Sequence, residues 1–357
     1  MTNRILVINP GSTSTKVSVF DQQTGEETHC QVIRHTTAEL ARFERIFDQL
    51  AFRRQLILDF LAQEGIELTS LIAVVGRGGL LRPIPGGTYE VNEAMIADLR
   101  SEKYNVHASN LGAILADDIA RSNQIKAYIV DPVVVDELQP EARISGLAGL
   151  QRRSVLHALN QKAVARAVLA EQGRTYEDSN LIVAHLGGGT SLAAHKRGRM
   201  IEVINGLDGE GPFTPERTGE LPLYDFAQLI IENQWTMAEV KKTLAGDGGL
   251  KSYTGETDIR ELIRRIDAGE DDLQPYIDAM AYQIAKAIGE MAVVLQGKVD
   301  AIILTGGVAY SSAIVRYIQT HVEWIAPVYT RPGEMEMRAL FEGVNRILTN
   351  QEAMKHY

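Results

Sequence analysis

Short apolar runs recur along this chain, and longer stretches of helical period separate them. The runs are typical of buried β-strands and cover residues 5–8, 71–75, 127–130, 181–184 and 299–304. A capping box at Thr36–Glu39 predicts the start of a long amphipathic helix that ends near Gln63. Further helical patterns cover 108–121, 152–170, 272–296, 309–319 and 335–348. Strands that alternate with helices predict an α/β fold with mixed sheets flanked by helices.

The first apolar run ends in a turn rich in small hydrogen-bond donors. Asn9-Pro10-Gly11 breaks the strand, because proline lacks an amide donor and glycine adopts backbone angles closed to other residues. Hydroxyl residues follow, including Ser12 and Ser14, and Lys16 begins the next strand. Such a turn presents amides and hydroxyls to a phosphate. It is not a Walker A loop, which has glycine before its lysine and a helix after it. A polar β-hairpin is the alternative interpretation.

Two later strands also lead into glycine-rich turns. The strand at 181–184 opens into His185, Leu186 and the triplet Gly187, Gly188, Gly189, and the strand at 299–304 opens into Thr305, Gly306 and Gly307. Placing Gly187 on Gly11 puts His185 on Asn9, and the separation is close to half the chain. This similarity favours an internal duplication with a phosphate-type turn in each half over a chance likeness of two hairpins.

Charged residues with possible chemistry fall near these turns. Arg77 and Asp131 each follow a strand, and ligands of α/β sheets bind beyond the carboxyl ends of strands. An exposed loop arginine and a cap before Pro132 are the alternative interpretations. His157 lies inside the predicted helix 152–170, where a packed or surface role is more common. Arg217 lies in the long, irregular loop 205–222, and loops of this kind are usually functional or mobile.

Composition narrows the class of protein. The 357 residues indicate two domains, and a net charge of −10 argues against nucleic acid or an anionic membrane as the main partner. Cys30 is the only cysteine, so an internal disulfide is excluded. No apolar run approaches the ~20 residues that span a bilayer. We therefore expect a cytoplasmic location.

The chemistry that fits best is phosphoryl transfer. No zinc-binding spacing, GxSxG elbow or GxGxxG motif occurs, which disfavours hydrolase and dehydrogenase activities. Phosphoryl transfer needs cations around the moving group, a bound Mg²⁺ and positioning more than covalent help.

Seven segments together resemble the butyrate kinase branch of the acetate kinase group, in the superfamily that contains sugar kinases, Hsp70 and actin. They are LVINPGSTSTK, VVGRGGLLRP, IVDPVVVDEL, RRSVLHALNQKAVAR, HLGGGTS, PFTPERTGELP and LTGGVAY, in this order over nearly the whole chain. The resemblance implies two duplicated domains of the ribonuclease H-like, actin-type ATPase fold, with ATP in a cleft between them. It implies residues 1–150 and 151–334 as the domains, with 335–357 packing back on the first.

The resemblance also implies a reaction and a set of site residues. In this reaction ATP, with Mg²⁺ as cofactor, phosphorylates a short-chain carboxylate reversibly. Butanoate and ATP give butanoyl phosphate and ADP. The implied catalytic residues are Arg77 on the carboxylate, Asp131, His157 on the transferring phosphoryl group, and Arg217 on the transition state. The implied ATP and phosphate ligands are Asn9, Gly11, Ser12, Ser14, Lys16, His185, Gly187, Gly188, Gly189, Thr305, Gly306 and Gly307. Asn9 and Glu334 are the implied magnesium residues.

Other functions remain open at this stage. At three places this chain has VGRGG, HALNQ and PERTGELP, whereas acetate kinases have different motifs there. These differences favour the butyrate branch over acetate or propionate kinase. A kinase for branched-chain acids such as isobutyrate or isovalerate is not separated by sequence. A non-enzymatic nucleotide module like actin or Hsp70 is the remote alternative. The resemblance implies a homo-oligomer, a dimer or larger.

Overall fold

The computed structural model describes residues 3–206 and 209–357, and this part of the chain divides into two compact units. Unit 1 comprises residues 3–135 and 335–357, and unit 2 comprises the described residues between 136 and 334. Each unit is an α/β layer structure with its own apolar core. The predicted α/β fold of mixed sheets flanked by helices is confirmed.

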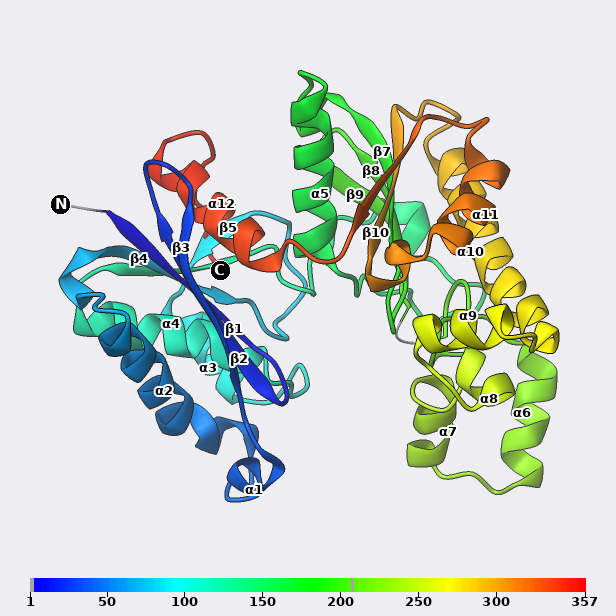
Figure 1. Cartoon of the computed structure of the whole chain (residues 1–357), viewed down its shortest axis with the longest axis horizontal. Helices are drawn as coiled ribbons and strands as arrows, with labels where there is room; N and C mark the ends of the chain where they lie inside the picture. Colours follow the sequence, from blue (N-terminus) through cyan, green and yellow to red (C-terminus); the bar gives the residue numbers. More distant parts are fainter. Residues whose placement is uncertain (1–2, 207–208) are drawn as a thin grey trace. The chain divides into compact units, whose positions relative to one another are not determined.

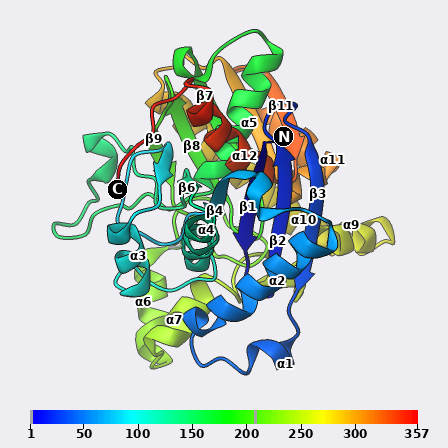
Figure 2. The ribbon, with the colours of Figure 1, turned by 90° about the vertical axis from the view of Figure 1, so that its left-hand side faces the viewer.

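Unit 1 is built on one mixed sheet with the strand order β3-β2-β1-β4-β6-β5. Strands β1, β2 and β3 form an antiparallel meander, whereas β4 and β6 continue the sheet in parallel with β1. Figure 2 shows the meander strands side by side. The strand bounds are β1 Arg4–Pro10, β2 Ser14–Asp21, β3 Glu27–Arg34, β4 Leu71–Arg77, β5 Thr88–Glu90 and β6 Lys126–Val130.

Helices α4 and α12 cover the sheet of unit 1 from its two faces (Figure 1). Both contact β1, β4 and β6, and α2 and α3 pack against α4. The helices are α1 Thr37–Leu40, α2 Leu50–Gln63, α3 Glu93–Arg100, α4 Asn110–Ser122 and α12 Glu336–Leu348, with 3-10 turns at Ile46–Gln49 and Leu68–Ser70. The C-terminal helix thus belongs to the same compact unit as the first strand.

The sheet of unit 2 has the order β9-β8-β7-β10-β11. Strands β7, β8 and β9 are an antiparallel meander, and β10 and β11 run parallel to β7. Unit 1 repeats this arrangement in β3-β2-β1-β4-β6, so the two sheets share one topology. The bounds are β7 Asn180–His185, β8 Ser191–Lys196, β9 Arg199–Ile204, β10 Ala301–Gly306 and β11 Val328–Pro332.

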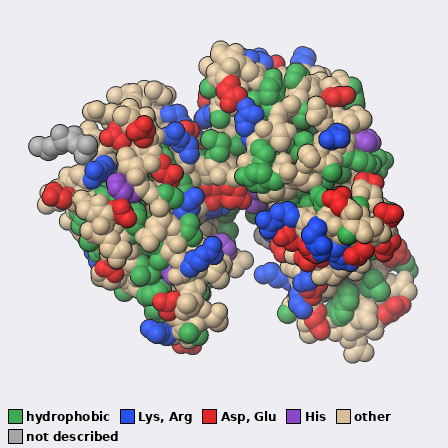
Figure 3. Space-filling view, in the orientation of Figure 1, with side chains coloured by type: hydrophobic (Ala, Val, Ile, Leu, Met, Phe, Trp, Pro, Cys, Tyr) green, Lys and Arg blue, Asp and Glu red, His purple; other side chains and the backbone are tan. Residues whose placement is uncertain are grey.

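Helix α5 lies on one face of this sheet and helices α10 and α11 on the other (Figure 1). Helices α6 to α9 lie together at one end of unit 2 (Figure 1). Their surface carries interspersed cations and anions (Figure 3), including ion pairs along α9 such as Arg264–Glu261. The helices are α5 Ala158–Glu171, α6 Leu223–Glu232, α7 Met237–Leu244, α8 Leu250–Thr254, α9 Ile259–Asp267, α10 Gln274–Val294 and α11 Ser312–Val322. Short 3-10 turns occupy Pro140–Arg143, Tyr176–Asp178, Asp271–Leu273 and Gly307–Tyr310.

Two helix predictions are wrong in their bounds. The capping box at Thr36 is present, but its helix stops after Leu40, and α2 begins only at Leu50. The predicted helix from 152 begins instead at Ala158, and the Arg152 side chain before it donates to the carbonyls of Ala142 and Val203. Over residues 3–206 and 209–357, no helix has the length and apolar character to cross a membrane.

Candidate active site

The carboxyl ends of the parallel strands in unit 1 bring three predicted residues to one edge of the sheet. Asn9 lies near the end of β1, Arg77 ends β4, and Asp131 directly follows β6. The register aligns Ile8 with Gly76 and Arg77 with Val130, so these ends are level with one another. The edge is where α/β sheets bind ligands.

A close helix–strand contact shapes this edge. A side chain at Gly76 would place its Cβ 2.0 Å from the carbonyl oxygen of Gly112, so only glycine lets α4 pack directly on β4. The start of α4 therefore lies beside the Gly78-Gly79 turn, where the amide of Leu80 donates to Asn110. His107 precedes this helix, and its pKa is lowered by burial and by the nearby charge of Arg77.

Glu336, the first residue of α12, joins two of the predicted residues. Its carboxylate forms an ion pair with Nη1 of Arg77 and accepts a 2.6 Å hydrogen bond from Nδ2 of Asn9. Both charged side chains are largely buried, at 19% exposed for Arg77 and 12% for Glu336. The structure thus places Glu336 beside Asn9, while Glu334 lies in unit 2 beside His185.

Asp131 is held in an unusual backbone conformation. Its φ is +37°, a left-handed value that costs a non-glycine residue energy and is common at functional sites. The side chain is 4% exposed, and its Oδ1 accepts a 2.7 Å hydrogen bond from the amide of Gly87. Asp131 therefore fixes the 85–87 loop against the end of β6.

The first predicted phosphate turn is a tight connection between β1 and β2. The amide of Gly11 donates to the carbonyl of Ser14 at 2.8 Å, which closes the turn, while Ser12 is exposed within it. Lys16 pairs with Asn9 in the antiparallel register, so the two side chains project from the same face of the sheet.

Arg53 of α2 lies buried directly beneath this turn. Its guanidinium donates to the carbonyls of Gly11 at 2.9 Å, Ser14 at 3.0 Å and Ser12 at 3.3 Å, and also to Thr15 Oγ1. The side chain is completely buried, and burial lowers its pKa to about 10, so it remains a cation at neutral pH. A buried positive charge behind a turn of small donors attracts an anion to that turn.

In unit 2, the second turn connects β7 to β8 and lies beside two stacked histidines. The rings of His157 and His185 have centroids 3.9 Å apart and are nearly parallel, at 9°. His157 is the residue that caps the start of α5 and does not lie within a helix, which corrects the sequence prediction. His185 ends β7, and its Nε2 is 3.5 Å from the carboxylate of Glu334.

The guanidinium of Arg217 lies flat against the second turn. A Cβ on Gly189 would be 2.2 Å from Arg217 Nη1, so a larger residue there would displace the guanidinium. Nη1 also donates to the carbonyl of Gly206 at 2.8 Å. The Arg217 loop is tied to the turn by Thr214, whose hydroxyl donates to the carbonyl of Gly188 at 2.6 Å.

The third turn packs on the second. Gly306 has a φ of +89°, and a Cβ there would be 2.3 Å from the carbonyl oxygen of Leu186. The amide of Val308 donates to the same carbonyl at 2.9 Å. Thr305 is fully buried, and Gly307 begins the short 3-10 turn that follows β10.

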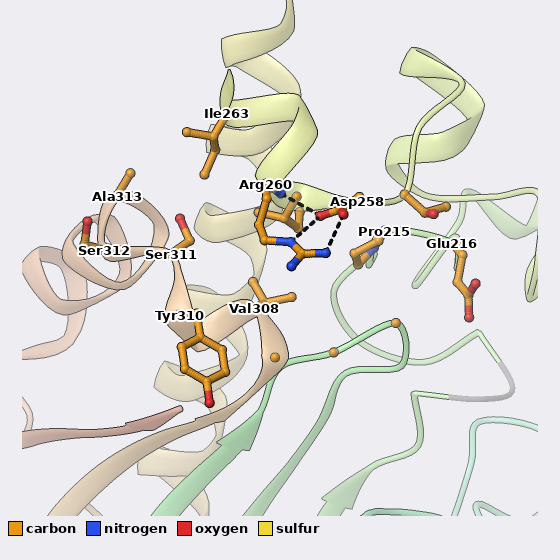
Figure 4. Close-up of a pocket in the computed structure, with 15 residues that line it drawn as sticks. Pro215, Glu216, Asp258, Arg260, Ile263, Val308, Tyr310, Ser311, Ser312 and Ala313 are labelled. Carbon is orange, nitrogen blue, oxygen red and sulfur yellow. Dashed lines mark hydrogen bonds and ion pairs between the residues drawn. The ribbon is translucent and has the colours of Figure 1, made fainter. Parts of the chain in front are cut away.

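A cavity of about 930 Å³ opens where the second and third turns meet the start of α9 (Figure 4). Its volume is in the range of small-molecule sites. Arg260 and Asp258 both line this cavity, and their side chains form an ion pair at 2.7 Å (Figure 4). The lining residues are Gly187, Gly188, Pro215, Glu216, Thr257, Asp258, Ile259, Arg260, Ile263, Gly307, Val308, Tyr310, Ser311, Ser312 and Ala313.

Sequence reasoning missed three residues of these clusters, namely Arg53, His107 and Glu336. Arg53 lies in a stretch of α2 that reads as an ordinary amphipathic helix, and Glu336 is one of two glutamates close together after β11. Only tertiary packing distinguishes them. The signal that could have found Glu336 is its place at the start of a helix that returns to the first strand.

The fold of two α/β units is shared with solved structures of kinases. The crystal structure of acetate kinase from Porphyromonas gingivalis matches with a TM-score of 0.78 at 17% identity, covering 98% of this chain and all of that one. A propionate kinase structure from Francisella tularensis matches with a TM-score of 0.73 at 17% identity, over 96% of this chain and 98% of that one.

Sequence comparison narrows this class to one family. The family model described as "Acetokinase family" matches residues 148–326. A relative from Enterococcus faecalis described as "Probable butyrate kinase" is 60% identical over 355 residues, 99% of this chain and 97% of its own length. The chain belongs to the acetokinase family and is a carboxylate kinase, and enzymes of this family use ATP or ADP with Mg²⁺.

Proposed function

We propose that the chain catalyses the reversible reaction of butanoate and ATP to butanoyl phosphate and ADP. The observation that carries the choice of butanoate is the 60% identity, over 99% of this chain, to the Enterococcus faecalis protein described as a probable butyrate kinase. Seven segments of this chain resemble the same branch of the family. Acetate, propionate and branched-chain acids are the competing substrates.

The reaction needs little covalent help from the protein. A carboxylate oxygen forms a bond to the γ-phosphorus, and the bond from that phosphorus to the ADP oxygen breaks. A short carboxylic acid has a pKa near that of a Glu side chain, about 4.3, so the substrate is already ionised at neutral pH. No general base is required. We therefore assign Asp131 an orienting role at the strand edge, consistent with its hydrogen bond to Gly87.

The main difficulty is that two anions must approach one another. Two unit charges about 4 Å apart repel by about 4 kcal/mol at an effective dielectric constant near 20. In unit 1, Arg77 is suited to hold the carboxylate, because its planar fork of donors matches carboxylate geometry even while Glu336 contacts Nη1. In unit 2, Arg217 and His157 are suited to stabilise the phosphoryl oxygens.

Magnesium fits the carboxylate of Glu336, which lies beside Asn9 at the strand edge. Mg²⁺ is usually bound by one or two carboxylates together with substrate phosphates, not by a complete protein cage. Within residues 3–206 and 209–357 no cluster of three or more acidic, histidine or cysteine side chains is arranged to hold a metal. We propose Glu336 with Asn9 as the magnesium pair in place of Asn9 with Glu334, because Glu336 contacts Asn9 whereas Glu334 lies beside His185. The ion would neutralise phosphate charge.

The nucleotide is assigned to the glycine turns and the cavity of unit 2. Gly187 and Gly188 line that cavity together with Gly307, so phosphate-type turns meet a space of about 930 Å³ suited to a nucleoside. Asn9, Gly11, Ser12, Ser14 and Lys16 form the corresponding turn of unit 1, with the Arg53 cation beneath it. We propose that both turns bind phosphate oxygens.

A substrate panel tests the proposed function. Initial rates with ATP and acetate, propionate, butanoate, isobutyrate or isovalerate are compared as kcat/KM. We expect butanoate to give the highest value, and acetate a value at least tenfold lower, because acetate lacks two methylenes and each one missing from an apolar pocket costs about 1–3 kcal/mol. A higher value for any other acid would replace butanoate. Tight ATP binding without acyl phosphate formation would favour a nucleotide module instead.

Replacing Arg77 by alanine should weaken binding of the carboxylate. A charge-assisted hydrogen bond contributes about 1.5–3 kcal/mol, so KM for butanoate is expected to rise ~10- to 100-fold. The KM for Mg-ATP should change little. Arg121, whose guanidinium pairs with Asp117 on the surface of α4, provides the matched control as Arg121→Ala. Unaltered butanoate saturation in Arg77→Ala would refute the assignment.

A further inference from the structure

Two consecutive residues in the first turn of helix α5 have amide side chains, and both are buried against strand residues. Asn160 is 1% exposed and Gln161 is fully buried. Asn160 contacts Nδ1 of His185 at 2.9 Å, and Gln161 contacts the hydroxyl of Ser191 at 3.1 Å. Ser191 in turn contacts Nδ1 of His157 at 3.0 Å. Each of the two stacked histidines is therefore held at Nδ1 by hydrogen bonds that lead back to the first turn of α5, directly from Asn160 for His185 and through Ser191 from Gln161 for His157.

We propose that Asn160 and Gln161 are positioning residues that keep His185 and His157 in the tautomer protonated at Nε2. This inference deepens the proposed function, since it rests on both histidines serving the phosphoryl group. Each step follows from which atoms can donate and which can only accept.

The orientation of the Asn160 amide is fixed by Thr305. The hydroxyl of Thr305 donates its proton to the carbonyl of Gly333 at 3.2 Å, so its oxygen is the acceptor for Nδ2 of Asn160, also at 3.2 Å. The NH₂ group of Asn160 thus faces the His185 ring as a donor. Nδ1 of His185 must accept that hydrogen bond, which leaves the ring proton on Nε2, the atom nearest Glu334.

The orientation of the Gln161 amide is fixed by a backbone carbonyl. Nε2 of Gln161 donates to the carbonyl oxygen of Ser191 at 3.0 Å, and a carbonyl can only accept. Oε1 then faces Nε2 of His195 at 3.1 Å, which must donate. Burial lowers the pKa of His195 to about 3, so the ring is neutral, and its Nδ1 accepts from the hydroxyl of Tyr176 at 2.7 Å.

The last step passes through the hydroxyl of Ser191. Its oxygen accepts from Nε2 of Gln161 and from the backbone amide of His157. Its own proton is then directed to Nδ1 of His157, so that ring also carries its proton on Nε2. Both stacked rings, whose centroids are 3.9 Å apart, therefore present an N–H donor at Nε2.

Exchanging the amide of Asn160 for a carboxylate should reverse one tautomer. In Asn160→Asp the side chain can only accept, so Nδ1 of His185 must become the protonated nitrogen, as in the aspartate–histidine pair of serine proteases, where the Asp-to-Asn exchange gives the wrong tautomer. Ring ¹⁵N spectra of protein labelled in histidine distinguish the two nitrogens. His185→Asn and His157→Asn identify the signals, and Asn233→Asp on the exposed end of α6 is the matched charge control.

We expect wild-type protein and Asn233→Asp to show His185 protonated at Nε2, and Asn160→Asp to show it protonated at Nδ1, with kcat at least tenfold lower. Ser191→Ala should convert His157 to a mixture of tautomers, because Nδ1 loses its donor. A wild-type ring protonated at Nδ1, or an unchanged ring in Asn160→Asp, would overturn the proposal. The spectra need no substrate, so a failed substrate panel would overturn the proposed function and leave this tautomer assignment standing.

Discussion

Replacing Arg217 by alanine is expected to lower kcat about 10³-fold while KM for Mg-ATP changes by less than about threefold. The guanidinium lies flat on Gly189 and donates to the carbonyl of Gly206, so it is held rigidly at the second turn. A preorganised cation that contacts charge developing in the transition state contributes more to the rate than to ground-state binding. Loss of such an arginine commonly costs ~10³ or more in phosphoryl transfer.

Two further variants sharpen this prediction. Gly189→Ala would force a Cβ to within 2.2 Å of Nη1, so it should displace the guanidinium and lower kcat without removing the charge. Arg264→Ala removes an arginine of α9 that is 67% exposed and pairs with Glu261, and it should leave the rate unchanged. Weaker ATP binding with normal turnover at saturation in Arg217→Ala would show that Arg217 binds the ground state instead.

The placement of the glycine turns could be read from the sequence because its signals are local. An apolar run ends, a glycine or proline follows, and the edge of a parallel sheet is where such turns gather. Asn9, Arg77 and Asp131 accordingly lie at the level ends of β1, β4 and β6. The repeated order of the strands also supports the internal duplication that the two similar turns indicated.

The helix starts were less predictable because tertiary contacts decide them. His157 was expected inside a helix, but Arg152 makes tertiary contacts with the carbonyls of Ala142 and Val203, and the helix starts one residue after the histidine. This shift is what lets Ser191 reach the ring of His157. Periodicity does not report such a contact, since the residues lie on separate elements.

Arg53 illustrates the same limit for charge. A helical arginine is normally solvent-exposed, and nothing local distinguishes Arg53 from its neighbour Arg54. The structure separates them, because Arg53 is buried beneath the first turn whereas Arg54 pairs with Asp118 at the surface. Burying a guanidinium is costly unless its donors are satisfied, and Arg53 donates to carbonyls, a hydroxyl and an amide oxygen around that turn.

Replacing Arg53 by methionine should both destabilise unit 1 and raise KM for Mg-ATP. Methionine keeps the apolar volume but removes the guanidinium that donates to the carbonyl of Gly11, and an unpaired buried group costs about 1–3 kcal/mol. We expect the urea midpoint to fall and KM for Mg-ATP to rise at least ~10-fold, because the turn loses both its support and its cation. Unfolding followed by far-UV circular dichroism, which reports both units, and initial rates at varied Mg-ATP provide the measurements.

The neighbouring residue gives a control matched in chemistry and position. Arg54→Met removes an arginine from the same helix, but its side chain is 34% exposed and its ion pair is at the surface, where such pairs contribute about 0–1 kcal/mol. Arg54→Met should therefore leave both the midpoint and KM near wild type. Arg53→Lys keeps the charge but cannot span Gln49 and the turn from one nitrogen, so it should restore part of the ATP affinity and little of the stability. A folded Arg53→Met protein with wild-type KM for Mg-ATP would show that the buried cation supports the turn structurally and takes no part in binding phosphate.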